Sequence, residues 1–185
     1  MAFDLKLSLA SELPNTHTWQ IECRQLAGKG DRSMKPLPHH YNVTVTTSEK
    51  HGIEITSPGL APFVSAPPAE FGGPGNLWSP ETLILAAVAD CFVLTFRAIA
   101  NVAKLQWSEL ACKATGTVDR SDGVIRFTDI VLRVNLSLSV GSDSSKAESL
   151  LHKVEKACLI GNSLKFEPRL EVDVTVEEPA LAPSA

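Results

Sequence analysis

One long apolar segment constrains the fold of this 185-residue chain more than any other stretch. Residues 79–104 read SPETLILAAVADCFVLTFRAIANVAK, with Ser79 as a favoured helix N-cap and Pro80 where a first-turn proline is tolerated. Glu81 follows at the positive end of the helix dipole. Because the positions from 83 to 103 are mostly apolar on every side, the pattern predicts a long central helix that is buried all round.

A membrane span is the alternative interpretation of this segment, since about 20 apolar residues suffice to cross a bilayer. Asp90, Arg97 and Asn101 interrupt it, however, and charged side chains are costly at bilayer depth. The sequence therefore favours a core helix in a protein that has no membrane partner.

The composition bounds the remaining function classes. A formal net charge of −4 gives no sign of a basic surface, so we expect no nucleic-acid partner. The first residues, MAFDLKLSLASELP, lack the features of a signal peptide, which predicts a cytoplasmic protein. Its 4 cysteines are then expected to be reduced, and to be buried, catalytic or redox-active. With no CxxC pair and no Cys/His cluster of zinc spacing, we expect no metal.

Alternating polar and apolar residues predict strands on both sides of the central helix. The predicted strands are Thr18–Arg24, Tyr41–Thr46 with a hairpin partner from Ile53, Leu110–Val118 and Ile130–Leu138 around the turn 119–123, and Leu170–Val176. Ile125 and Phe127 have the opposite parity to Ile130, which predicts a bulge near Thr128. A second helix is predicted from about Ser142, with Cys158 on its buried face in the last turn and Gly161 as its stop.

The order of these elements predicts an α+β fold, with antiparallel sheets around the long central helix. We expect an N-terminal extension over residues 1–40, a folded domain over 41–177 and a disordered tail over 178–185.

The stretch Ser57–Trp78, rich in Pro, Gly and Ser, is too long for an ordinary connection, and such loops are often functional. We expect it to border a cleft and to supply apolar side chains from Phe63, Phe71 and Trp78, with a plain surface linker as the alternative.

Two of the cysteines lie on predicted helices, Cys91 in the middle of one and Cys158 at the end of the other. A reactive thiolate needs a nearby cation, a histidine or a helix N-terminus. A helix C-terminus disfavours an anion, so if the two thiols form a redox pair, Cys91 attacks and Cys158 resolves. Taken singly, each is also consistent with an inert buried cysteine, as is Cys112 on the apolar face of a strand.

The segments around these two cysteines resemble the motifs of the OsmC/Ohr family. SPETLILAAVADCF is similar to the first-cysteine motif, and VEKACLIGNSL, residues 154–164, is similar to the second. The resemblance spans about Tyr41 to Val176 and implies an intertwined α+β homodimer. It also implies a thiol-dependent peroxidase that reduces organic hydroperoxides in oxidative-stress defence, without metal or other cofactor and with an external dithiol as reductant. Cys91 would be the peroxidatic thiolate, Cys158 the resolving thiol and Glu81 a member of the site.

Glu81 precedes Cys91 by ten residues, which is about 15 Å along a helix. Their side chains cannot meet on one helix, so a carboxylate that serves the thiol would come from the partner subunit.

The sequence departs from the family at one point. Relatives hold the thiolate with an arginine from an early hairpin, whereas the comparable turn here, TTSEKHG, offers Lys50 and His51. Arg97 stands six residues after Cys91 and is expected on the opposite side of the helix. The departure keeps a second hypothesis open, a non-catalytic dimer that binds a small apolar ligand in its cleft. A purely structural or protein-interaction dimer is a third.

Overall fold

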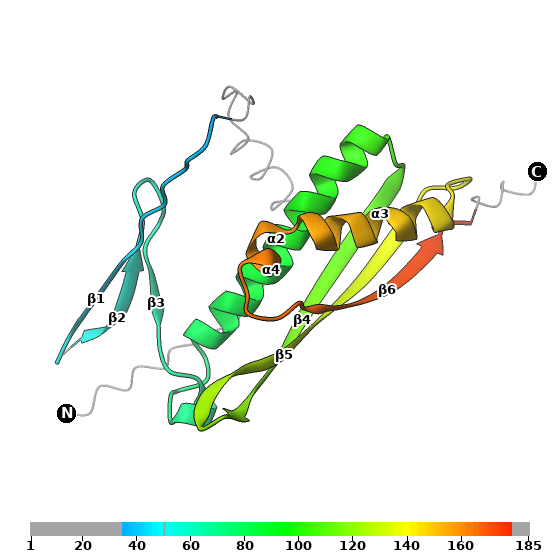
Figure 1. Cartoon of the computed structure of the whole chain (residues 1–185). Coiled ribbons are helices and arrows are strands. Elements are labelled where there is room, and N and C mark those ends of the chain that lie inside the picture. The colour runs from blue at the N-terminus through cyan, green and yellow to red at the C-terminus, as the bar shows by residue number, and fades with distance from the viewer. Residues whose placement is uncertain (1–34, 50, 179–185) are drawn as a thin grey trace, which may run out of the picture. The chain divides into compact units, whose positions relative to one another are not determined.

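The computed structural model describes residues 35–49 and 51–178, and for His51 the backbone alone. The predicted strand Thr18–Arg24 and the candidate cation Lys50 lie outside the described residues. The chain divides after Tyr41, and the elements below all belong to the unit that begins at Asn42. Figure 1 labels these elements along the chain.

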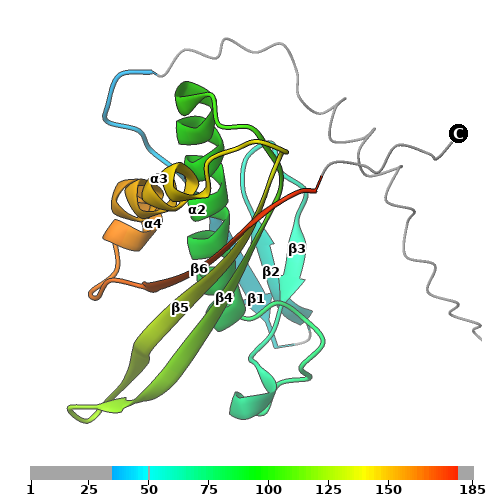
Figure 2. The same cartoon turned by 90° about the vertical axis from the view of Figure 1, so that its right-hand side faces the viewer.

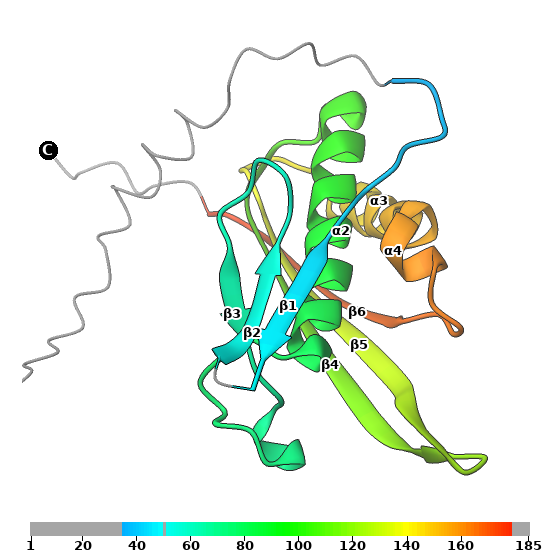
Figure 3. The ribbon, with the colours of Figure 1, turned by 90° about the vertical axis from the view of Figure 1, so that its left-hand side faces the viewer.

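The first sheet contains three short antiparallel strands, β1 (Thr44–Ser48), β2 (His51–Thr56) and β3 (Phe63–Ser65), in that order. Figure 3 shows β1 and β2 as a hairpin with β3 on the other side of β2. The β1–β2 hairpin confirms the prediction from alternating residues. Strand β3 lies within the long loop and was not expected, because prolines flank its three residues.

The rest of the loop is held at its two ends. Ser65 forms a parallel bridge with Trp78, and the Ala66 amide donates to the Trp78 carbonyl at 3.0 Å. Between them lies a 3₁₀ turn, η1 (Ala69–Phe71). An added Cβ at Gly73 would stand 1.6 Å from the carbonyl oxygen of Pro67, so only glycine fits where these two backbone segments pass.

The long helix, α2 (Pro80–Ala103), begins and ends where the sequence predicts. Ser79 and Thr82 form a capping box, in which the Thr82 hydroxyl accepts from the Ser79 amide at 2.8 Å and the Ser79 hydroxyl accepts from the Thr82 amide at 3.3 Å. Lys104 closes the helix in the left-handed conformation, with φ 54°.

The expectation that α2 is buried all round is wrong for the single chain. Four apolar residues, each four positions after the last, are fully buried, namely Val88, Phe92, Phe96 and Ala100. Leu94 and Val102, on other sides of the helix, are 54% and 83% exposed. In the most apolar 18-residue window only 22% of the residues are buried. By length and composition α2 could cross a membrane, a property that it shares with core helices of water-soluble proteins.

The second sheet has the order β4–β5–β6, with β4 (Trp107–Ser121), β5 (Val124–Leu138) and β6 (Arg169–Val176). The β4–β5 hairpin confirms the predicted pair, and its register shifts where Val118 pairs with Phe127 but Thr117 with Asp129. This shift leaves Thr128 unpaired and confirms the predicted bulge. Strand β6, however, runs parallel to β5, so the sheet is mixed and not purely antiparallel.

The parallel pair follows from the connection between the two strands, because parallel neighbours need a long crossover. Here the crossover carries α3 (Ser144–Ala157) and the short α4 (Leu159–Asn162). Figure 2 shows α2 and α3 against the same face of this sheet. Side chains of α2, α3 and β5 form one core there, extended by the edge-to-face pair Phe96–Trp107 at 5.1 Å.

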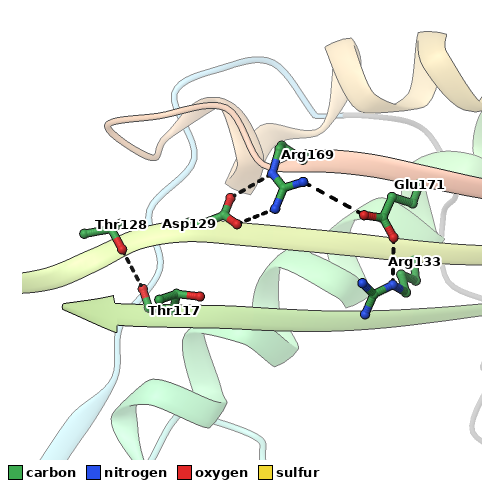
Figure 4. Close-up of polar contacts among 6 residues, drawn as sticks. All are labelled: Thr117, Thr128, Asp129, Arg133, Arg169 and Glu171. Carbon is green, nitrogen blue, oxygen red and sulfur yellow. Dashed lines mark hydrogen bonds and ion pairs between the residues drawn. The ribbon is translucent and has the colours of Figure 1, made fainter.

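The opposite face of the second sheet is mostly polar and exposed, with Val131 as a buried apolar exception on β5. Arg169 donates to Asp129 at 2.6 Å, and Arg133 donates to Glu171 at 2.7 Å, so that the two pairs form a row across β5 and β6 (Figure 4). The sheet therefore presents one face to the core and one to solvent. The α+β class predicted from the order of elements is confirmed.

Candidate functional site

Cys158 lies at a junction between two helices and not in the last turn of one. Helix α3 ends at Ala157, Cys158 adopts an extended conformation, and α4 begins at Leu159. The Cys158 side chain is the N-cap of α4, because its Sγ accepts from the Gly161 amide at 3.4 Å. Gly161 is thus inside α4, and the prediction that it stops the preceding helix is wrong. The prediction that Cys158 is buried is confirmed by its exposure of 2%.

Cys91 comes to the same place from the middle of α2. Its Sγ accepts from the amide of Ile160 at 3.5 Å, although 69 residues separate the two positions. Two cysteine sulfurs therefore accept from consecutive backbone amides of one short segment, Ile160 and Gly161. This shared segment, with the packing of α2 on α4, brings together the two thiols that the sequence singles out.

The environment of Cys158 holds its thiol in the protonated form. Burial raises the pKa of Cys158 above its ordinary value of 9.0, and a side-chain hydrogen bond and electrostatic interaction with Cys91 raise this pKa further. The amides of Gly161 and Ile160 act in the opposite direction, because they stabilise the thiolate. The neighbouring amides of Ile160 and Gly161, which donate to Cys91 and Cys158 respectively, bring the two sulfurs to one site.

A third thiol, Cys112, belongs to the same neighbourhood. It lies on the inward face of the second sheet, where Cys112 pairs with Val134 of β5 and Val134 with Val172 of β6. Burial raises its pKa to about 11, and electrostatic interaction with Cys158 contributes to this increase. Cys112 therefore packs as a small apolar side chain at neutral pH.

A cavity of about 230 Å³ lies beside Cys158, between the helices and the segment that leads into β6. Its apolar lining comes from α2, β5 and that segment, and includes Val88, Phe92, Leu132, Leu164 and Phe166. Charged residues also line it, among them Lys165 and the ion pair of Lys156 with Glu167 at 3.5 Å. Cys158 is among its lining residues and Cys91 is not.

Glu81 lies at the other end of α2, beside a different cavity of about 370 Å³. Its Oε2 is buried and has no hydrogen-bond partner among residues 35–49 and 51–178. Phe71 lines this cavity with Leu85 and Phe127, and an added Cβ at Gly116 would stand 2.5 Å from the Phe127 ring. In one chain, Glu81 and Cys91 are thus in different sites, as their spacing on the helix predicts.

The other predicted site residues are more dispersed. Phe63 in β3 is 38% exposed and Trp78 is 53% exposed, and neither lines the cavity beside Cys158. Arg97 is exposed on α2. No lysine, arginine or histidine side chain within the described residues donates a hydrogen bond to Cys91, so the candidate cations Lys50 and His51 stay a prediction. In the same part of the chain, no group of three or more His, Cys, Asp or Glu residues could hold a metal ion.

Sequence reasoning missed the backbone donors Ile160 and Gly161, as well as the lining residues of the cavity. Backbone amides leave no trace in residue type, so no sequence signal could have identified them. The short run after Cys158, in which Gly161 interrupts the helical pattern, was the nearest available sign of a separate turn.

The fold and the paired thiols define an α+β protein in which a cysteine of the central helix α2 meets a cysteine at the α3–α4 junction. The model of the OsmC-like protein family matches residues 73–173, which include both cysteines and Glu81. The chain belongs to the OsmC-like family.

Individual relatives agree with this assignment. The uncharacterized protein YmaD of Bacillus subtilis is 27% identical over 126 residues, which cover 66% of this chain and 83% of that protein. An OsmC-like protein of unknown function from Vibrio cholerae superposes with a TM-score of 0.69 at 20% identity, over 74% of this chain and 100% of that one. An organic hydroperoxide resistance protein from Elizabethkingia anophelis gives a TM-score of 0.63 at 21% identity, over 78% and 100%. At these identities the solved structures show a common fold.

Proposed function

We propose that the protein is a thiol-dependent peroxidase that reduces organic hydroperoxides, with Cys91 as the peroxidatic and Cys158 as the resolving thiol. The observation that carries this proposal is the pairing of the two sulfurs on consecutive amides, Ile160 and Gly161. Membership of the OsmC-like family, some of whose structural relatives are organic hydroperoxide resistance proteins, supports it.

The chemistry needs no metal or other cofactor. The Cys91 thiolate attacks one peroxide oxygen, the O–O bond breaks, and the alkoxide leaves as an alcohol after taking a proton. Cys91 then carries a sulfenic acid. The Cys158 sulfur attacks the Cys91 sulfur, water leaves, and the two cysteines form a disulfide. Two electrons from an external thiol reductant restore the pair.

The proposal includes a homodimer, because the single chain leaves the site incomplete. Glu81 Oε2 is buried without a partner in the described part of the chain, which is costly for a carboxylate unless a cation or donor approaches it. Apolar residues on α2, such as Leu94 and Val102, are also exposed to solvent in the single chain. A partner subunit would supply a donor or cation for Glu81 and a packing surface for α2. It would also bring its own Glu81 towards Cys91 of this chain.

A second candidate is a dimer of the same fold that binds a small apolar ligand without turnover. The observation that favours it is that a backbone amide, and no described cation, donates to Cys91. A reactive thiolate needs a nearby cation, a histidine or a helix N-terminus, so without one the reactivity of Cys91 towards peroxide would be weak.

The test combines mass spectrometry with two variants. One equivalent of cumene hydroperoxide added to the reduced protein is expected to remove two hydrogens, mapped to a Cys91–Cys158 link. Cys91→Ser is expected to abolish peroxide consumption. Cys158→Ser is expected to consume about one equivalent and to retain a dimedone-reactive Cys91. The reversed pattern would make Cys158 the peroxidatic and Cys91 the resolving thiol. Unchanged thiols in all three proteins would favour the dimer that binds an apolar ligand without turnover.

A further inference from the structure

The cavity beside Cys158 has no part in the attack on peroxide proposed above, because Cys91 does not line it. We propose that this cavity is the binding site of the thiol reductant, and that the reductant attacks the Cys158 sulfur of the oxidised pair. The inference rests on the proposed function, since it requires a Cys91–Cys158 disulfide as an intermediate.

Access to the two cysteines differs, because Cys91 is half-buried and Cys158 is buried. Cys158 is 2% exposed, so a reductant can reach its sulfur only through an opening inside the protein. The cavity of about 230 Å³ is such an opening, and Cys158 is among its lining residues. Its apolar residues, including Phe92, Leu132 and Phe166, suit an aliphatic body. Its charged residues include both signs, so it offers no preference for a charged molecule. The expected ligand is a small, neutral, aliphatic thiol or dithiol.

Attack at Cys158 also suits the leaving group. In thiol–disulfide exchange the sulfur that is not attacked leaves as a thiolate, and a thiol with a high pKa leaves slowly. Burial raises the pKa of Cys158, which makes this sulfur a poor leaving group. The Ile160 amide donates to Cys91 Sγ at 3.5 Å and would stabilise Cys91 as the departing thiolate.

The step balances with a dithiol as the only reagent. One thiolate of the reductant bonds to Cys158 Sγ, the Cys91–Cys158 bond breaks, and Cys91 leaves as a thiolate. The second thiol of the reductant then attacks the reductant's first sulfur, which is bonded to Cys158. The bond to Cys158 breaks, and Cys158 leaves as a thiolate and takes a proton. The cysteines gain two electrons and the dithiol becomes a cyclic disulfide. With a monothiol, a second molecule takes the place of the second thiol.

The first test traps the intermediate in the wild-type protein. Diamide forms the disulfide without any peroxide, so the test does not depend on peroxidase activity. A short exposure to 2-mercaptoethanol, an acid quench and N-ethylmaleimide are followed by peptide mapping. The expected product carries mercaptoethanol on Cys158 and N-ethylmaleimide on Cys91. Mercaptoethanol on Cys91 would overturn the inference.

The second test narrows the cavity with a matched control. Lys165 lines the cavity, whereas Lys153 is exposed on α3 and does not. Lys165→Trp is expected to slow reduction of the preformed disulfide by dithiothreitol by about tenfold, and Lys153→Trp to leave it unchanged. Equal rates in the two variants would overturn the inference. A disulfide that forms with diamide but not with hydroperoxide would instead refute the proposed peroxidase alone, and no disulfide with either oxidant would refute both.

Discussion

The two sheets of this protein have the same number of strands but differ in what they bury. The second sheet, β4–β6, lies under α2 and α3 and contributes fully buried residues such as Ile130 and Leu138. In the first sheet, β1–β3, Ser65 is the one buried residue among the described side chains, and every residue of β1 is exposed. A sheet normally needs an apolar cover to be stable. Among the described residues the first sheet therefore lacks an apolar cover, and the proposed partner subunit would supply one.

The largest expected effect is a loss of stability in the second sheet and the helices α2 and α3 that cover it, which share one core. Phe92 is fully buried between α2 and the sheet, so Phe92→Ala should lower the free energy of unfolding by about 3–5 kcal/mol. Urea denaturation of the reduced protein measures this loss. Ala98→Gly, at an exposed position of the same helix, is the control and should cost about 1 kcal/mol. Equal losses in the two variants would refute the separate core.

The next effect tests the dependence of the first sheet on a partner. Val45 is 59% exposed in the single chain, and a charge placed there would be buried by a second subunit. Val45→Asp should raise the dimer Kd by about a hundredfold, which corresponds to ~2.8 kcal/mol. Sedimentation over a concentration series measures the shift, with Thr46→Asp on the opposite face of the strand as control. A wild-type protein that stays monomeric at micromolar concentration would refute the dimer.

A smaller effect concerns pH. The pKa of Cys112 is raised from 9.0 to about 11, so the folded state holds this proton more tightly than the unfolded state. The stability it contributes is present below pH 9 and is lost as pH rises through 11. Cys112→Ala should therefore lose less stability than the wild type over this range, as measured by thermal unfolding. Parallel curves for the two proteins would contradict the raised pKa.

The smallest effect is expected on the polar face of the second sheet. Arg169 holds the pKa of the Asp129 carboxyl below its ordinary value of 3.8, mainly by a side-chain hydrogen bond. This stabilisation is present above pH 3.8 and is lost as pH falls through the lowered pKa of Asp129. Both side chains are exposed or half-exposed, so Arg169→Gln should lower the Tm by no more than a few degrees at pH 7. The difference between the variant and the wild type should disappear in strong acid, and a difference that persists there would point to another cause.

Local sequence signals predicted much of the second sheet and of the helices that cover it. Ser79 and Pro80 fixed the start of α2 because capping is a short-range effect, and the change of parity between Phe127 and Ile130 located the bulge. The parallel direction of β6 was missed, since alternation of side chains is the same in both directions. The helical crossover before β6 was the signal that could have indicated it.

Other features depend on contacts that a single sequence does not specify. Strand β3 exists because Phe63 and Ser65 pair with β2, although three residues between prolines carry no strand pattern. The apolar surface of α2 predicted burial, but among the described residues Leu94 is 54% exposed, and the proposed partner subunit would have to cover it. The convergence of Cys91 and Cys158 followed from the family resemblance and not from their spacing along the chain. Their shared segment, Ile160–Gly161, could be found only in the structure.

The parallel crossover also sets an order in time. The β4–β5 hairpin pairs neighbouring residues and can close early, whereas β6 must wait for the intervening helices. Residues 164–168, which line the cavity beside Cys158, lead directly into β6. On a ribosome, where the chain emerges from its N-terminus, α2 and Cys91 are complete long before this cavity can form. In a nascent chain, Cys91 is therefore already on its helix before the cavity beside Cys158 can form around β6.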